Sequence, residues 1–252
     1  MPTNSAQVFS DNQLPPAARR SSSLDAQALI VAESLEFVGI VRAWGESIET
    51  ADSYTQGHCQ RVAELATLLA RDTGLDRSVL LWFHMGALLH DVGKLEVPVE
   101  VLNKRGRLQP DEMDMMRKHP VFGECLVNDV RFPWDVRPMI RSHHEHWDGS
   151  GYPDRLRGED IPLTARILCI ADVYDALTSE RTYRPAREPD DAMTIMVLES
   201  GKTFDPELLH TFVEKTLPEY RRRTGEPELS SLLSLGEVRR FNWLDSGLPS
   251  VS

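Results

Sequence analysis

Three short stretches of the sequence are rich in histidine and aspartate. They read GALLHDVGK over residues 86–94, HHEHWDGSGYP over residues 143–153 and IADVYDALTS over residues 170–179. Neutral imidazole and carboxylate are the protein ligands that suit Zn, Fe, Mn and similar divalent ions. The three stretches therefore indicate chemistry that depends on bound metal.

Two aspartates stand where an isolated charge is unstable. Asp91 follows an apolar helical run, and Asp172 lies within another. Burying an unpaired carboxylate costs on the order of several kcal/mol, so each of these side chains needs a cation. Taken alone, Asp91 could instead cap a neighbouring helix, and His90 could be a satisfied core histidine.

Five of the eight histidines fall at the start or end of predicted helices, where several helix ends can converge on one cavity. They are His58, His90, His119, His143 and His144. Adjacent helical residues point about 100° apart. For His90 and Asp91 this geometry suits a monodentate imidazole beside a carboxylate that bridges two metals.

The surrounding sequence predicts helices. Apolar residues recur at spacings of three and four, and no run alternates with period two. The pattern predicts an all-α fold, a compact helical bundle with a metal site at converging helix ends. We expect an N-terminal helix over residues 24–50 and further helices over residues 58–73, 76–91, 110–128, 134–146, 163–178, 188–200 and 206–216.

The remaining segments are predicted to be tails or loops. Residues 1–23 are rich in Ser, Pro, Ala, Asn and Gln, and we expect a disordered tail because they offer little apolar surface to bury. Residues 147–162 carry three glycines and two prolines, which predicts a loop. For the C-terminal tail, residues 218–252, a short docking helix and a frayed end both remain open.

Composition excludes some partners. The chain of 252 residues has no apolar run long enough to span a membrane, so we expect a cytoplasmic protein. Its net charge of -11 argues against broad binding to a nucleic-acid polymer or an anionic membrane. An anionic small substrate remains compatible, because bound metal ions reverse the local field.

The ordered set of motifs resembles a known family. His58, the pair His90–Asp91 and the distant Asp172 resemble the H…HD…D signature of the HD superfamily of metal-dependent phosphohydrolases. HDVGK, HP at His119, HHEHWDGSGYP and IADVYDALTSERTYRP are similar to the HD-GYP subgroup, bacterial phosphodiesterases that hydrolyse cyclic di-GMP. The resemblance implies an HD-GYP catalytic domain over residues 51–217.

The resemblance implies a centre with two divalent metal ions that share the Asp91 carboxylate. One ion would be held by His58, His90, Asp91 and Asp172, and the other by Asp91, His119, His143 and His144. The mixed nitrogen and oxygen ligands favour Fe or Mn, with Zn, Co or Ni compatible by affinity. Family members with three metals carry a glutamate where this chain has Tyr54, whose phenol is a poor ligand. Two metals are therefore expected.

The resemblance also implies roles at the substrate. Asp91 and Lys94 are the expected catalytic residues. Lys94 would lie near the scissile phosphate, where it or a water that it orients would protonate the departing ribose oxygen. Arg181 and Arg184 would grip phosphates, although two arginines in a solvated loop are the alternative. The expected substrate contacts are Gly151, Tyr152, Pro153, Arg181, Arg184 and Asp175.

Other polar residues near the motifs receive supporting roles. Glu145, Asp148 and Asp175 are expected to orient ligand imidazoles or the loop. His84, His146 and His210 fall outside the motifs and are expected to be structural or surface residues.

The implied function is hydrolysis of cyclic di-GMP to linear pGpG, with GMP as the product of a second cut. Two readings compete with it. One is a regulatory module of low turnover that binds the dinucleotide or a diguanylate cyclase (GGDEF protein) through the GYP loop. The other is an HD hydrolase of another nucleotide, such as a different cyclic dinucleotide or a nucleoside phosphate. A homodimer is a further candidate assembly.

Overall fold

The computed structural model describes residues 38–48, 50–52, 57–130, 132, 134–180 and 186–225. The chain divides into two compact units, residues 1–40 and 41–252, and the core and the candidate site lie in the second. The predicted tail over residues 1–23 lies outside the described residues. Of the predicted helix over residues 24–50, the described part is helical.

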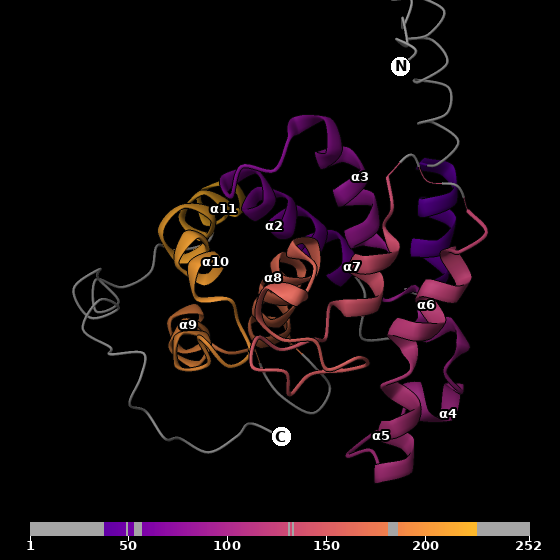
Figure 1. Ribbon diagram of the computed structural model, residues 1–252. Helices are drawn as coiled ribbons and strands as arrows, with labels where there is room; N and C mark the ends of the chain where they lie inside the picture. Colours follow the sequence, from indigo (N-terminus) through magenta and orange to yellow (C-terminus); the bar gives the residue numbers. More distant parts are fainter. Residues whose placement is uncertain are drawn as a thin grey trace, which may run out of the picture. The chain divides into compact units, whose positions relative to one another are not determined.

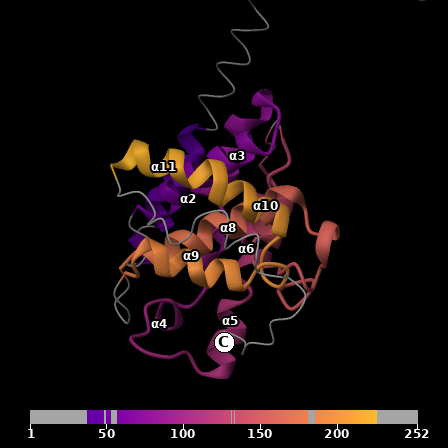
Figure 2. The ribbon, with the colours of Figure 1, turned by 90° about the vertical axis from the view of Figure 1, so that its left-hand side faces the viewer.

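The described part of the second unit is helical (Figures 1 and 2), which confirms the predicted all-α fold. Its residues contain one isolated bridge, between Ser200 and Phe204, and no strand. After the helical residues 41–48, the elements are α2 (His58–Asp72), α3 (Arg77–Leu88), η2 (Val92–Glu96), α4 (Val99–Leu102), α5 (Pro110–Met116), α6 (His119–Val127), α7 (Arg137–Ser142), η3 (Gly158–Asp160), α8 (Leu163–Thr178), α9 (Pro189–Leu198), α10 (Pro206–Thr211), η4 (Phe212–Thr216) and α11 (Leu217–Thr224).

The core fixes α2 and α8, two helices that carry residues of the candidate site. Helix α8 packs against α2, α7 and α9, and it lies among them in Figure 1. Leu65 and Leu69 of α2 are buried together with Ile167 and Leu168 of α8. Each such side chain contributes about 1.5–3 kcal/mol when fully buried. This packing holds the start of α2 beside the second half of α8.

The prediction of one helix over residues 110–128 is wrong, because this segment forms two helices, α5 and α6. Pro120 lies at the start of α6 and has no N–H to donate to the carbonyl of Met116, one turn earlier. The Met116 carbonyl therefore accepts a hydrogen bond from another donor, the His119 ring. The break therefore serves the site directly.

Three other predicted helix ends also need correction. Helix α3 ends at Leu88 instead of residue 91, so His90 and Asp91 lie in a turn before η2. Helix α7 is shorter than the predicted 134–146, and residues 143–146 already belong to the following turn and loop. The helix predicted to end at residue 216 continues through α11. A π-helical turn, η4, comes before Pro218, where a regular helix would need the N–H that proline lacks.

The described part of the C-terminal segment is a docked helix. Leu217, Tyr220 and Arg221 of α11 are buried, and α11 contacts α2. Residues 226–252 lie outside the described residues. None of the described helices is both long and apolar enough to cross a membrane. The cytoplasmic location stays a prediction.

Candidate metal centre

The side chains predicted as metal ligands come together in two adjoining groups. In each group the potential ligand atoms lie within 4.8 Å of one another. We call them the His58 group and the His119 group. The His58 group contains His58, His90 and Asp172, and the His119 group contains Asp91, His119, His143 and His144.

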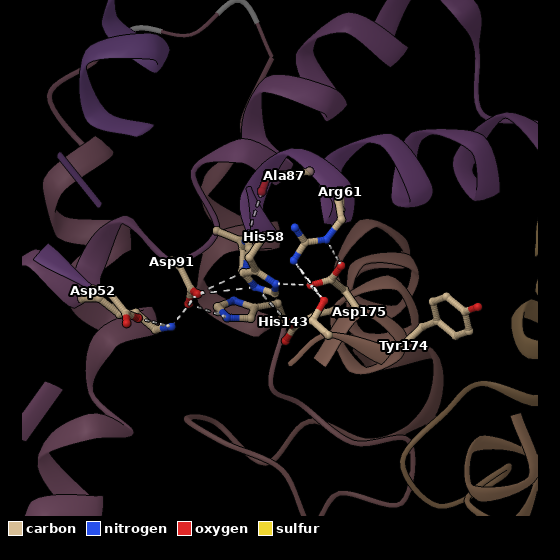
Figure 3. Close-up of polar contacts among 12 residues, drawn as sticks. Asp52, His58, Arg61, Ala87, Asp91, His143, Tyr174 and Asp175 are labelled. Atoms are coloured by element: carbon tan, nitrogen blue, oxygen red, sulfur yellow. Dashed lines mark hydrogen bonds and ion pairs between the residues drawn. The ribbon is translucent and has the colours of Figure 1, made fainter. Parts of the chain in front are cut away.

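Asp91 lies between the two groups. Its Oδ1 is 3.2 Å from His119 Nε2 and 3.9 Å from His143 Nε2. Its Oδ2 is 3.4 Å from His90 Nε2 and 4.0 Å from His58 Nε2. One carboxylate oxygen therefore faces each group (Figure 3), as the predicted bridging role requires.

Three of the imidazoles are held in the same way. Each follows the last turn of a helix, and its Nδ1 donates to a carbonyl of that turn, three residues earlier. Because a carbonyl can only accept, Nδ1 carries the proton and Nε2 presents a lone pair to the cluster. The bonds run from His90 to Ala87 at 2.7 Å, from His119 to Met116 at 2.8 Å and from His143 to Ile140 at 2.7 Å.

His58, the first residue of α2, is held differently, because its ring contacts side chains instead of a backbone carbonyl. Its Nδ1 lies 2.7 Å from Asp175 Oδ2 on α8, and its Nε2 lies 3.4 Å from Asp172 Oδ1. Asp175 was expected both among the substrate contacts and as an orienting residue. Its buried position behind His58 supports the orienting role.

The lone pairs of the cluster provide a test of whether metal ions fit. His119 Nε2 and His143 Nε2 lie 3.3 Å apart, and both are unprotonated when Nδ1 is the donor. Two facing lone pairs repel each other. His90 Nε2 is buried without a hydrogen-bond partner, which costs about 1–3 kcal/mol. A cation in each group would relieve both defects, so these residues fit a pair of divalent ions.

The electrostatics of the metal-free cluster also suit metal binding. Burial lowers the pKa of His144 to about 3, and burial beside other imidazoles holds the pKa of His143 well below its usual value. Both rings are therefore neutral and ready to coordinate. Burial alone would lower the pKa of His58, but hydrogen bonds to Asp172 and Asp175 raise it to about 9.

Lys94 of η2 forms an ion pair with the Asp91 carboxylate. Its Nζ lies 2.8 Å from Asp91 Oδ2 and 3.1 Å from Asp52 Oδ2. Burial disfavours the ammonium, but the two carboxylates raise the pKa of Lys94 above its ordinary value, so it is a cation at neutral pH. Asp52 was not predicted from the sequence, because no spacing links it to Lys94.

The GYP loop, residues 151–153, touches the His119 group. A Cβ atom on Gly151 would lie 2.5 Å from the His144 carbonyl oxygen and 2.5 Å from Glu145 Cα, so only glycine fits. The Tyr152 ring stacks on the His144 imidazole, with centroids 4.9 Å apart and planes at 23°. The loop therefore forms one edge of the cluster.

Charged side chains fix the chain that follows this loop. Glu145 accepts hydrogen bonds from the backbone N–H of Asp154 at 2.7 Å and of Leu156 at 3.1 Å. Arg141 pairs with both oxygens of Asp154, at 2.6 and 2.8 Å, and with Glu124 at 2.5 Å. Glu145 thus orients the loop, one of the two supporting roles expected for it. Asp148 accepts from the N–H of Ser150, in the segment that leads into the GYP loop.

The remaining residues named from the sequence are outside the described part of the structure or outside the two groups. Tyr54, Arg181 and Arg184 fall outside the described residues. His84 and His146 contact Thr67 and Ser150, His210 is exposed, and none of the three belongs to either group.

Two basic residues were missed: Arg61, which pairs with Asp175 at 2.6 Å, and Arg117, which lies 5.6 Å from the Tyr152 ring centroid. Arg61 follows His58 by one helical turn, a spacing that could have suggested a shared face.

Comparison with known proteins is consistent with this arrangement. The family model described as HD domain matches residues 46–208. The chain is 42% identical over 162 residues to the cyclic di-GMP phosphodiesterase response regulator RpfG of Xanthomonas campestris, which covers 64% of this chain and 43% of the relative. It is 36% identical over 182 residues to the 3'3'-cGAMP-specific phosphodiesterase 3 of Vibrio cholerae. This match covers 72% of this chain and 40% of the relative. The chain thus spans about two fifths of the length of each relative.

A solved structure supports the fold. Bd1817, described as an HDG"Y"P protein from Bdellovibrio bacteriovorus, matches 71% of this chain and 63% of its own with a TM-score of 0.54 and 21% identity. The helical architecture is therefore shared with a solved protein.

Proposed function

We propose, since the chain belongs to the HD domain family, that it is a metal-dependent phosphodiesterase that hydrolyses cyclic di-GMP. The observation that carries the proposal is the position of Asp91, with one carboxylate oxygen toward each group of potential ligands. Such a shared carboxylate suits a pair of ions acting on one phosphodiester. The name of the relative from Xanthomonas campestris supports cyclic di-GMP as the substrate.

The metal content belongs to the same proposal. The His58 group with Asp91 would hold one ion, and the His119 group, which includes Asp91, would hold the other. When bound, such ions supply a nucleophile near neutral pH and neutralise charge on the phosphate. The mixed nitrogen and oxygen ligands favour Fe or Mn. Because Tyr54 offers no carboxylate, we propose two ions per chain rather than three.

The chain's own residues would act on the substrate around this centre. The Lys94 ammonium, held between Asp91 and Asp52, is the proton donor we propose for the departing ribose oxygen. Tyr152, stacked on His144, would contact the bound nucleotide at the edge of the centre. Arg181 and Arg184 remain the proposed phosphate contacts. Hydrolysis of one diester would give pGpG, and a second cut would give GMP.

A second substrate has specific support. The relative from Vibrio cholerae is named for 3'3'-cGAMP, which shares one guanosine and both phosphodiesters with cyclic di-GMP. Because the metal ions would act on the phosphodiester common to both, the residues that hold them do not discriminate between the two dinucleotides. Hydrolysis of 3'3'-cGAMP in preference to cyclic di-GMP is therefore the alternative function.

A regulatory module of low turnover that binds a diguanylate cyclase is less well supported. A binding module has no need of a full set of ligands, whereas every predicted ligand in the described residues joins one of the two groups. The cyclase as a partner and the homodimer stay predictions.

The decisive experiment measures the hydrolysis of cyclic di-GMP, 3'3'-cGAMP and cyclic di-AMP by protein whose metal content has been determined. We expect the highest kcat/KM for cyclic di-GMP, with pGpG and GMP separated by chromatography. Asp91→Asn should abolish turnover, while Asp129→Asn, at an exposed aspartate, should not. Near-native turnover in Asp91→Asn would overturn the proposal.

A further inference from the structure

Helices α2 and α8 meet through two pairs of polar residues with matched spacing. On α2, His58 and Arg61 are one turn apart, as are Asp172 and Asp175 on α8. His58 contacts both aspartates, and Arg61 contacts Asp175. Figure 3 shows Arg61 and Asp175 next to His58, with Asp91 on its other side. Arg61 therefore lies one side chain removed from a proposed metal ligand.

Arg61 holds Asp175 through a two-pronged ion pair. Its Nε lies 2.6 Å from Oδ1, and its Nη2 lies 3.0 Å from Oδ2, the oxygen that accepts from His58 Nδ1. The same Nη2 donates to Ser179 Oγ at 3.0 Å, and this hydroxyl lies 3.2 Å from Asp175 Oδ2. Two parallel bonds fix both the position and the plane of a carboxylate. The plane of the Asp175 carboxylate in turn sets the direction of the His58 ring.

This support distinguishes His58 from three of the other proposed ligands. His90, His119 and His143 donate to backbone carbonyls, which helix ends hold in place. His58 depends on a side chain, and a carboxylate acceptor raises the basicity of a ligating imidazole. A buried carboxylate also needs a compensating charge, and the Asp175 side chain is only 7% exposed. The guanidinium of Arg61 supplies that charge.

We propose that Arg61 is a positioning residue that acts through Asp175 on His58 and sets the metal affinity of the His58 group alone. The inference rests on the proposed metal centre. The His119 group has its own supports, none of which involves Arg61 among the contacts described. Loss of Arg61 should therefore weaken one of the two metal-binding steps and leave the other unchanged.

The competing explanation is that Arg61 only ties α2 to α8. A tie of that kind would contribute to the stability of the fold, and its loss would not discriminate between the two groups. Metal affinity measured step by step separates the two roles, because it does not depend on turnover.

The test uses metal-free full-length protein titrated with Co²⁺, followed by visible absorption and by competition with a chelator. In Arg61→Ala, one binding step should weaken by about 10–100-fold, the usual effect of removing a residue that orients a ligand, and the other step should keep its wild-type affinity. Arg61→Lys, which keeps the charge but lacks the two-pronged geometry, should weaken the same step by a smaller factor. It also tests the proposal if Arg61→Ala fails to fold.

Arg141→Ala is the matched control. Arg141 is also partly exposed and also pairs with two oxygens of an aspartate, but its partner Asp154 belongs to the segment after the GYP loop. This variant should keep both metal-binding steps. Wild-type affinity in both steps for the two Arg61 variants, or equal weakening of both steps, would overturn the proposal. Failure of the wild-type protein to hydrolyse cyclic dinucleotides would contradict the proposed function and leave this inference standing.

Discussion

Lys94 Nζ lies 2.8 Å from Asp91 Oδ2, the carboxylate oxygen that also faces the His58 group. Without bound metal, the Lys94 ammonium therefore neutralises part of the negative charge of Asp91, the charge that would attract a metal ion. Lys94 and an ion on the same side of Asp91 repel each other. The residue proposed as a proton donor is thus expected to oppose metal binding slightly.

This relationship predicts opposite effects on binding and catalysis. Lys94→Met should leave metal content unchanged or raise metal affinity, because a competing cation has been removed. The same variant should lose about 10²–10⁴-fold in kcat, the usual contribution of a general acid. Elemental analysis and steady-state kinetics on one preparation give both values.

The control for this variant is Lys104→Met, since Lys104 pairs with Glu112, which is not a proposed ligand. It should keep both metal content and kcat. If Lys94→Met lost its metals, Lys94 would be a support of the centre and not a proton donor beside it.

The two aspartates proposed as ligands should differ in how many ions depend on them. Asp91 faces both groups, so Asp91→Ala should lose both ions and nearly all turnover. Asp172 belongs to the His58 group and lies 3.4 Å from His58 Nε2, so Asp172→Ala should lose one ion and keep the other. Metal per chain after gel filtration in metal-free buffer measures the difference. Equal losses in the two variants would argue against Asp91 as the shared ligand.

Proton release on metal binding should depend on His58. In the metal-free protein its hydrogen bonds to Asp172 and Asp175 raise its pKa to about 9, so the ring is protonated at pH 7. A metal ion needs the neutral ring, so binding to the His58 group should release about one proton below pH 9 and none well above it. Affinity for this ion should therefore rise with pH up to about 9 and then level off. His144, whose pKa is about 3, is already neutral and adds no such dependence.

Calorimetry in two buffers of different ionisation enthalpy counts the released protons. At pH 7 the wild-type protein should release about one proton more than at pH 10. His58→Gln should remove this difference between the two pH values. Identical proton release at both pH values in the wild-type protein would contradict the assignment to His58.

The candidate ligands could be named from the sequence because the motifs that carry the family resemblance are short and local. His90 and Asp91 end an apolar run, and Asp172 interrupts another, so local sequence carried the signal. The break before α6 was missed, although Pro120 marked it, because the apolar pattern continued across it. In the structure α5 has no buried residue, whereas α6 has four, and periodicity alone does not register a missing N–H.

The supports of the ligands were harder to predict, because they join segments far apart in the chain. Asp52 meets Lys94 across 42 positions and Arg61 meets Asp175 across 114. Such pairs follow from how α2, α8 and η2 pack, which periodicity does not fix. Asp175 was recognised as an orienting residue only because it lies in a motif; its partner Arg61 carried no comparable mark.

The stack of Tyr152 on His144 separates substrate binding from metal binding. Tyr152 contacts the ring face of a proposed ligand and supplies no ligand atom of its own to either group. Tyr152→Ala should therefore keep both ions while KM for the dinucleotide rises, by about 2–10-fold if the aromatic contact contributes about 0.5–1.5 kcal/mol. Tyr152→Phe keeps the ring and should stay close to wild type, unless the hydroxyl itself contacts substrate, in which case KM alone should rise. Bis(p-nitrophenyl) phosphate, which lacks the nucleoside, should be hydrolysed equally by all three proteins. Loss of metal in Tyr152→Ala would mean that the tyrosine holds His144 in place, and the division between loop and ligands would be wrong.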